Sequence, residues 1–369
     1  MNRLFRWDQM GLFLLALAAG ILPFAVPEVC AAALREGLAL CSGPLLLSLF
    51  PFLVVSRLLV QCPESDLLAM PFRLAAWSIG IRTPCAARVL CIGFLGGFAP
   101  AASAAAQAVR TGQLTAEEAD ALLPACICSG PSFVVLTVGQ SLLGSAELGA
   151  LLFASQITAN YLTAALLNRF AGVRSVKPGS AAPASPAPPR LDEILADAAI
   201  TYCKLCGFIL FFRMLAAGAG ALLPAGAGTL CAILLEVCSG CDLASRTGRW
   251  GSLLCCAALS VQGLSVLLQV RTICPPEMTL RPLYRARMLH LPLSLALFYL
   301  LLPGGEADVF STLPARVLLM RRVPPDCALL VFAVCCMAAC TLRSGIRQVE
   351  QKQMARNAGG CCINSKTLL

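Results

Sequence analysis

Polar side chains interrupt two apolar segments in the second half of the chain, where they could bind a small polar molecule. In chain order they are Glu236, Ser239, Asp242, Ser260, Gln262 and Gln269. An ionisable group inside a bilayer is costly, so an acidic residue between ILL and VC indicates function, and Glu236 is the leading candidate. Ser239 follows three residues later and would share a helix face with Glu236.

Each of these side chains also has a structural interpretation. Glu236 could form an ion pair with Arg213 or Lys204 instead of contacting a ligand. Asp242 could cap a helix near the membrane edge. His290 is the only histidine and has no clustered partners, so a hydrogen bond within the packed helices is a simpler expectation than a metal site.

In the first half of the chain, glycine, proline and serine residues interrupt the apolar segments. GFLGGFAPAAS (93–103) places Gly96, Gly97 and Pro100 within one segment, and CSGPSF interrupts another at 129–131. Irregular backbone is tolerated at membrane depth only where it is buried in protein or lines a wet cavity. Such breaks aim the N-termini of half-helices at a central site, where their partial positive charge favours an anion. The alternative is a kink at a close crossing of helices.

Together these features define a predicted substrate site and exclude several other functions. Its candidate residues are Gly96, Gly97, Pro100, Ser129, Gly130, Pro131, Glu236, Ser239, Ser260 and Gln262. No metal site, cofactor or catalytic residue is predicted, because the sequence lacks a Walker A loop, HExxH, a GxSxG elbow and any paired set of CxxC motifs. An enzyme is therefore the least favoured class.

The composition places the chain in a bilayer. Hydrophobic residues make up 58% of its 369 residues and charged residues 13%, against about 25% charged in soluble domains. The mean hydropathy is +0.80. The net charge of +9 comes from loops and the tail, where basic residues orient a membrane protein and do not indicate nucleic-acid binding. The 21 cysteines lie largely within apolar runs, so we interpret them as small packing residues.

The apolar segments and one linker divide the chain into related halves. The predicted segments are 10–27, 43–61, 85–108, 122–143, 147–169, 198–222, 228–245, 252–270, 282–303 and 325–342. The first is interpreted as a retained helix, since no cleavage site follows it. The Pro/Ala/Ser-rich stretch 171–190 predicts a flexible linker. On either side of it, similar segments recur in the same order, which indicates an internal repeat.

The distribution of basic residues predicts that the two repeats are inverted. The loop after 43–61 is basic while its counterpart after 198–222 is uncharged; conversely, 271–287 is basic while the loop before 147–169 has no basic residue. Basic loops mark the cytoplasmic side, so this exchange is expected for inverted topology, with both chain termini in the cytoplasm. The basic stretch 316–322 disagrees, because this topology places it outside. The predicted fold is an all-α polytopic membrane protein of two inverted repeats, with broken or re-entrant helices and about 8–10 hydrophobic segments.

Two short motifs are predicted to be structural. Thr115 and Glu118 form a capping box that opens a helix. The stretch 66–80, DLLAMPFRLAAWSIG, is amphipathic and is expected to lie at the cytoplasmic interface.

Six segments resemble a known family in their order and spacing. They are LFPFLVVSRLL, GFLGGFAPAAS, LTAEEADALL, CSGPSFVV, LLEVCSGCDL and SVQGLSVLLQ. They are similar, over about 40–305, to sporulation integral membrane proteins of the YlbJ type, within the nucleoside-recognition, or Gate, domain group. Gly96–Pro100 departs from the family's Ser-Gly-Tyr-Pro-like turn, whereas Glu236 and Gly240 match its Glu-x-x-x-Gly pattern. The resemblance implies transport of dipicolinate across the outer forespore membrane during endospore formation.

The resemblance also implies a domain organisation. We expect an N-terminal helix and interfacial segment (1–42), a first Gate-like repeat (43–170), the linker (171–197), a second Gate-like repeat (198–303), and a C-terminal helix with a cytoplasmic tail (304–369). The expected function is transport of a small anionic metabolite through a bacterial cell membrane. Nucleoside transport and a non-transporting sporulation scaffold are the alternatives, and self-assembly into a homo-oligomer is compatible with each of them.

Overall fold

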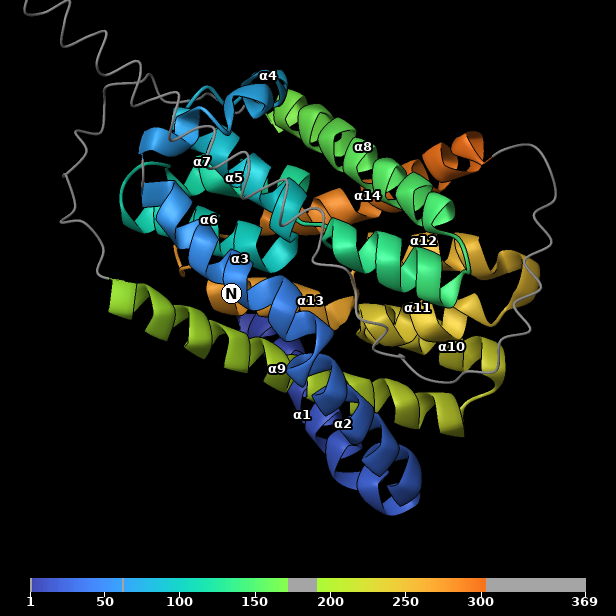
Figure 1. Cartoon of the computed structure of the whole chain (residues 1–369). Coiled ribbons are helices and arrows are strands. Elements are labelled where there is room, and N and C mark those ends of the chain that lie inside the picture. The colour runs from blue at the N-terminus through green and yellow to red at the C-terminus, as the bar shows by residue number, and fades with distance from the viewer. Residues whose placement is uncertain (1, 62, 172–190, 303–369) are drawn as a thin grey trace, which may run out of the picture.

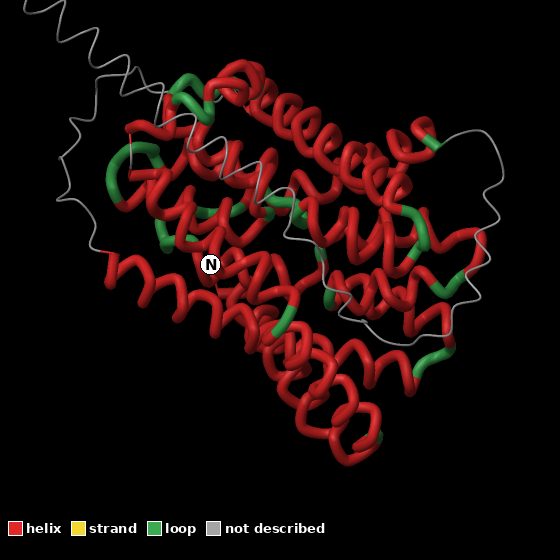
Figure 2. The backbone as a smooth tube through the Cα atoms, viewed as in Figure 1, coloured by secondary structure: helices red, strands yellow, loops and turns green. Residues whose placement is uncertain are grey.

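The computed structural model describes residues 2–61, 63–171 and 191–302, and all regular structure within these ranges is helical (Figures 1 and 2). Two helices, α8 (Ala146–Ala171) and α9 (Leu191–Leu222), and the segment 248–273 are long and apolar enough to cross a membrane. The chain is therefore an all-α polytopic membrane protein, as the sequence predicts. The predicted linker 171–190, the segment 325–342, the basic stretch 316–322 and the tail lie largely or wholly outside the described residues.

The N-terminal region forms two helices where the sequence predicts one. α1 (Asn2–Ala25) meets α2 (Pro27–Ser42) at a sharp bend, and the apolar part of α1 makes an angle of 111° with α2. If this bent pair is a single span, it is a fourth candidate crossing. Pro27 begins α2 because proline suits the first turn of a helix. α2 packs along α9, and its predicted place at the membrane interface stays a prediction.

The first half continues through α3 (Pro44–Gln61) and a short 3-10 turn (Pro63–Asp66) to α4 (Met70–Ser78). α4 exposes Met70, Leu74 and Trp77 on one face, as an amphipathic helix does, and its place at the cytoplasmic interface stays a prediction. α7 (Ala116–Cys126) begins with the predicted capping box, in which Thr115 Oγ1 accepts a hydrogen bond from Glu118 N at 3.1 Å.

Two helix pairs fold back on themselves as re-entrant hairpins. α5 (Pro84–Gly96) and α6 (Phe98–Arg110) pack against each other, as do α10 (Ala225–Leu235) and α11 (Val237–Ser245). Within the first hairpin, Gly97 makes the reversal with φ 81° and ψ −165°, a region that is essentially restricted to glycine. The segments 85–108 and 228–245 are therefore hairpins, and not continuous spans.

Two other pairs are interrupted without folding back, so each continues through the molecule. They are α7 with the π-helix η2 (Ser132–Leu142), and α12 (Gly251–Val261) with α13 (Gly263–Ile273). In the second pair, Gln262 at φ 66° and Gly263 at φ 71° interrupt the helix. Between α11 and α12 lies a 3-10 turn (Gly248–Trp250).

Each half then closes with one long helix, and these two helices pack together. α8 closes the first half and α14 (Arg281–Leu301) the second. The order of span, hairpin, interrupted span and closing span thus occurs twice, and Figure 1 shows the two hairpins lying toward opposite ends of the molecule. This arrangement has the geometry of inverted repeats.

Candidate functional site

A cavity of about 60 Å³, here called the inner cavity, lies where the four interrupted helix pairs meet. Its walls come from both halves: Leu45, Leu49, Leu95, Gly96, Phe98, Ser129, Gly130, Ser132, Phe133, Ile209, Glu236, Val237, Cys238, Val266 and Gln269. It has room for roughly four water molecules, at about 15 Å³ each. Four of the predicted site residues, Gly96, Ser129, Gly130 and Glu236, are therefore brought together at one place.

Close backbone contacts hold the breaks of each half together. A Cβ atom on Gly97 would lie 2.7 Å from Gly130 N, and one on Gly263 would lie 2.9 Å from Glu236 N. Each half thus contains two interrupted helix pairs in close contact. A glycine with positive φ at the break of one pair packs against the backbone at the break of the second pair in the same half. Gly97, Pro100 and Pro131 shape the turns beside the cavity without lining it.

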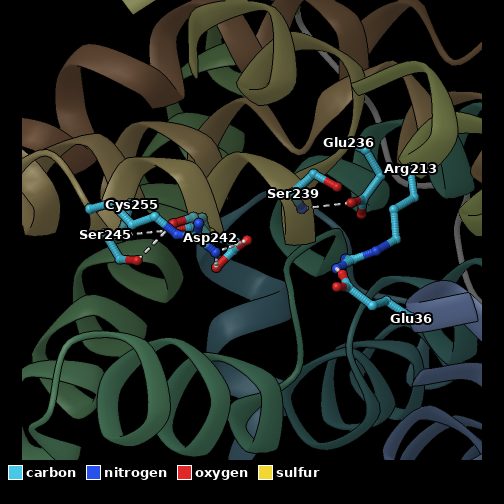
Figure 3. A network of polar contacts seen from close by, with 9 residues as sticks. Glu36, Arg213, Glu236, Ser239, Asp242, Ser245 and Cys255 are labelled. Carbon is cyan, nitrogen blue, oxygen red and sulfur yellow. Dashed lines mark hydrogen bonds and ion pairs between the residues drawn. The ribbon is translucent and has the colours of Figure 1, made fainter. Parts of the chain in front are cut away.

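Glu236 is a helix cap, which the sequence interpretation did not foresee. Its carboxylate accepts hydrogen bonds from Cys238 N at 2.8 Å and Ser239 N at 2.7 Å, at the start of α11. Only 2% of the residue is exposed. Figure 3 shows Arg213 passing beside Glu236 and reaching Glu36, with which it forms an ion pair at 2.8 Å. Arg213, one of the two partners in the alternative ion-pair interpretation of Glu236, thus pairs with Glu36.

This cap changes the expected electrostatics of the cavity. A carboxylate at a helix N-terminus stabilises the partial positive charge there, so the end of α11 already has its anion. The N-terminal residues of α6 and η2, Phe98 and Ser132, also line the cavity. The partial positive charges of the N-termini of α6 and η2 are therefore the ones available to a ligand in the cavity. Asp242 lies inside α11 and pairs at 2.8 Å with Arg246, the C-cap residue of that helix, so it is not an N-cap.

Arg287 joins the interrupted helices of the two halves and was missed in the sequence, where it was counted with the basic loop 271–287. It is buried within α14, and its guanidinium donates to Ile127 O and to Ser260 O. These carbonyls belong to the C-terminal ends of α7 and α12. A cation stabilises the partial negative charge of such ends. The Arg287 side chain therefore stabilises the C-terminal ends of both α7 and α12.

Besides Gly97, Pro100 and Pro131, three predicted site residues do not line the inner cavity: Ser239, Ser260 and Gln262. Ser239 donates its backbone N–H to Glu236. Ser260 accepts a hydrogen bond from Gln156 Nε2 at 2.9 Å, in the interface between α8 and α12. Gln262 donates to Leu259 O at 2.8 Å and to Ser129 Oγ at 3.4 Å, so it links the second break to the first. Ser260 and Gln262 therefore have hydrogen-bond partners within the protein, and the partner Ser129 of Gln262 lines the cavity. His290 shares a hydrogen bond with Gln156 O at 3.2 Å, which matches the packing interpretation.

Gln269 lines the inner cavity but was not among the predicted site residues, although the sequence analysis identified its segment as polar. Its Nε2 donates to Ser265 Oγ at 2.9 Å. Its Oε1 is buried and has no hydrogen-bond partner among the described residues. A buried amide oxygen without a partner is unfavourable, so this position is suited to a polar ligand or water.

Reciprocal ion pairs cross-link the two halves on either side of the inner cavity. Arg57 on α3 pairs with Asp197 on α9 at 2.5 Å, while Arg213 on α9 pairs with Glu36 on α2. Sixteen residues separate the two α9 positions, a rise of about 24 Å along the helix. The sequence identified Arg57 and Arg213 as equivalent positions, but their partners become evident only in the antiparallel packing.

The described residues hold no cluster of three or more potential metal ligands, and the cysteines among them are free. Most of these cysteines are buried, as expected for packing residues. Comparison of the chain with protein-family models, with curated proteins and with solved structures finds no match. The geometry of the site therefore carries the functional argument.

Proposed function

We propose that the protein is a membrane transporter for a small anionic metabolite. The observation that carries the proposal is a mainly apolar cavity with a few polar side chains, Ser129, Ser132, Glu236 and Gln269. It lies at the junction of four interrupted helix pairs and is lined by both halves of an inverted arrangement. Secondary transporters place their substrate sites near the membrane midplane, at the interface between such repeats.

The reciprocal ion pairs fit a mechanism of alternating access. The hydrocarbon core of a bilayer is about 30 Å thick, so two pairs about 24 Å apart along α9 would lie toward its opposite faces. Leu45, Leu49 and Ile209 line the cavity between them. At about 60 Å³, this cavity is far smaller than the about 300 Å³ at which small-molecule pockets begin. Transport therefore requires the two halves to move apart around the site.

Dipicolinate is the proposed substrate, with a role in endospore formation, on the strength of the resemblance to YlbJ-type proteins. It is a small aromatic dianion, which suits the N-terminal ends of α6 and η2 at the cavity. Bacterial cell membrane residence, including the outer forespore membrane, and cytoplasmic chain termini belong to the same proposal.

Nucleoside transport is the second candidate, and Glu236 favours it. An ionised carboxylate in the cavity repels a dianion but accepts hydrogen bonds from a neutral base or ribose. The two candidates therefore differ in the charge of the substrate.

Flux into proteoliposomes distinguishes these candidates. We expect purified protein to move dipicolinate and to leave uridine outside, with protein-free liposomes as the control. Uptake of uridine alone would support the nucleoside alternative. Movement of neither solute would contradict the transport proposal and favour a sporulation scaffold.

Glu236→Gln should raise the initial rate of dipicolinate uptake about tenfold, the effect of about 1.4 kcal/mol, because the neutral side chain no longer repels the dianion. Glutamine keeps the size of the side chain but loses the negative charge and one of the two acceptor oxygens at the α11 N-terminus. The loss of capping should lower stability by only about 0.5–2 kcal/mol, so the melting temperature should fall by a few degrees. Initial uptake rates and melting curves in one detergent measure both effects. The control is Glu277→Gln at an exposed carboxylate; equal uptake by both variants would contradict a role for Glu236 in transport.

A further inference from the structure

A second cavity, here called the vestibule, is lined by residues of α3, α6, α9 and α13 and has a volume of about 160 Å³. Its lining residues include three basic side chains, Arg57, Arg110 and Lys204, and one acidic side chain, Asp197. Their net charge is therefore +2. Asp197 and Arg110 are exposed, so the vestibule is accessible from the surface of the protein.

The vestibule also has hydrogen-bonding capacity that the protein does not use. Ser103 is 3% exposed, and its hydroxyl has no hydrogen-bond partner within the described ranges. Arg57 donates to Asp197 through Nη1, while its buried Nε has no such partner there. A buried hydroxyl and a buried guanidinium N–H are both donors. Donors beside a positive charge are complementary to a carboxylate.

The vestibule and the inner cavity are neighbours, because Gln269 lines both of them. A ligand held in the vestibule would therefore lie next to the inner cavity. Asp197 already places a carboxylate against Arg57 at 2.5 Å. The Asp197 side chain shows that Arg57 can bind a carboxylate, and it would compete with the carboxylate of a ligand for Arg57.

We propose that the vestibule is a binding site for the carboxylate of a small organic anion, with Arg57 as its principal ligand. Arg110 and Lys204 supply the attractive field and Ser103 a neutral hydrogen bond. The incoming carboxylate displaces Asp197 from Arg57, and the rest of the molecule extends toward the mouth. As an entry site the vestibule rests on the proposed transport function, but binding itself does not require transport.

Calorimetric titration of the purified full-length protein with pyridine-2,6-dicarboxylate tests this site. The neutral pyridine-2,6-dicarboxamide is the ligand control, since it keeps the ring and loses both charges. We expect the dicarboxylate to bind and the dicarboxamide to bind at least about tenfold more weakly, as hydrogen bonds to charged groups are about twice as strong as neutral ones. Arg57→Gln should weaken dicarboxylate binding at least about tenfold.

Asp197→Asn gives the sharper test, because it should strengthen dicarboxylate binding about three- to tenfold by removing the internal competitor. A structural role for the Arg57–Asp197 pair predicts no such gain. The matched control is Glu147→Gln, which makes the same change of charge at the exposed start of α8 and should leave binding unchanged. Unaltered affinity in both Arg57→Gln and Asp197→Asn would overturn the proposal, even if the protein transports dipicolinate. Binding that depends on Arg57 without any flux would support the vestibule and contradict the transport function.

Discussion

Gly97→Ala should prevent accumulation of the folded protein. The new Cβ would lie 2.7 Å from Gly130 N and 3.0 Å from Gly130 Cα, and both are backbone atoms that a rotamer change cannot move. The φ of 81° and ψ of −165° at Gly97 add a conformational cost, about 1–3 kcal/mol for a residue with a side chain. Together with the clash, this cost is a large part of a typical stability of about 5–15 kcal/mol.

The matched control for this prediction is Gly144→Ala. Gly144 also has positive φ, at 75°, but a Cβ there meets nothing within 4 Å, so the variant isolates the backbone cost from the clash. The amount of monodisperse protein after size-exclusion chromatography in one detergent measures both variants. Gly263→Ala should behave like Gly97→Ala, because it creates the corresponding clash in the second half. Normal yields of Gly97→Ala would contradict the close contact between the breaks.

Arg287→Met should cause the second large loss of stability. Methionine fills much of the space but cannot donate to Ile127 O or Ser260 O, and an orphaned buried carbonyl costs about 1–3 kcal/mol. Asn160 Nδ2 still donates to Ile127 O at 3.3 Å, so we expect a net loss of about 3 kcal/mol. The melting temperature in detergent should fall by about 6–12 °C, from about 2–4 °C for each kcal/mol.

Arg285→Met is the control for Arg287→Met, since it removes the same side chain from an exposed position on the same helix. We expect it to shift the melting temperature by about 1 °C at most. Arg287→Lys should be intermediate, because an ammonium keeps the charge but lacks the planar fork that reaches two carbonyls. A melting temperature of Arg287→Met equal to that of the wild-type protein would contradict a role for this guanidinium in stabilising the two helix ends.

The helical segments and their order could be predicted because apolar runs and loop charges are local properties of the sequence. Whether a run crosses the membrane or turns back is not local. The segment 85–108 is long enough to cross, and only the conformation at Gly97 and the packing of α5 on α6 make it a hairpin. The helix α2 was also missed, since its amphipathic sequence contains Glu28, Arg35 and Glu36.

The site was predictable in its types of residue but not in their roles. Glu236 was identified because a buried acid is rare in an apolar segment, whereas its capping role depends on the extended conformation of its backbone. Ser260 and Gln262 have the same polarity as cavity residues but face other helices. Arg287 was assigned to a loop because Arg281 and Arg285 precede it. Sequence spacing does not show that the third arginine of this series is buried.

The length of α9 has a consequence for the lipid that surrounds the protein. Its 32 residues span about 48 Å, against a hydrocarbon thickness of about 30 Å. Burying the whole helix would require a tilt of about 50°, beyond the about 40° that membrane helices reach. Part of α9 must therefore extend beyond the hydrocarbon, and we expect this part to be the acidic first turn, with Asp192 and Glu193. Asp197 follows within two turns, so we expect its ion pair with Arg57 to lie close to the lipid phosphates, which could bind the same guanidinium.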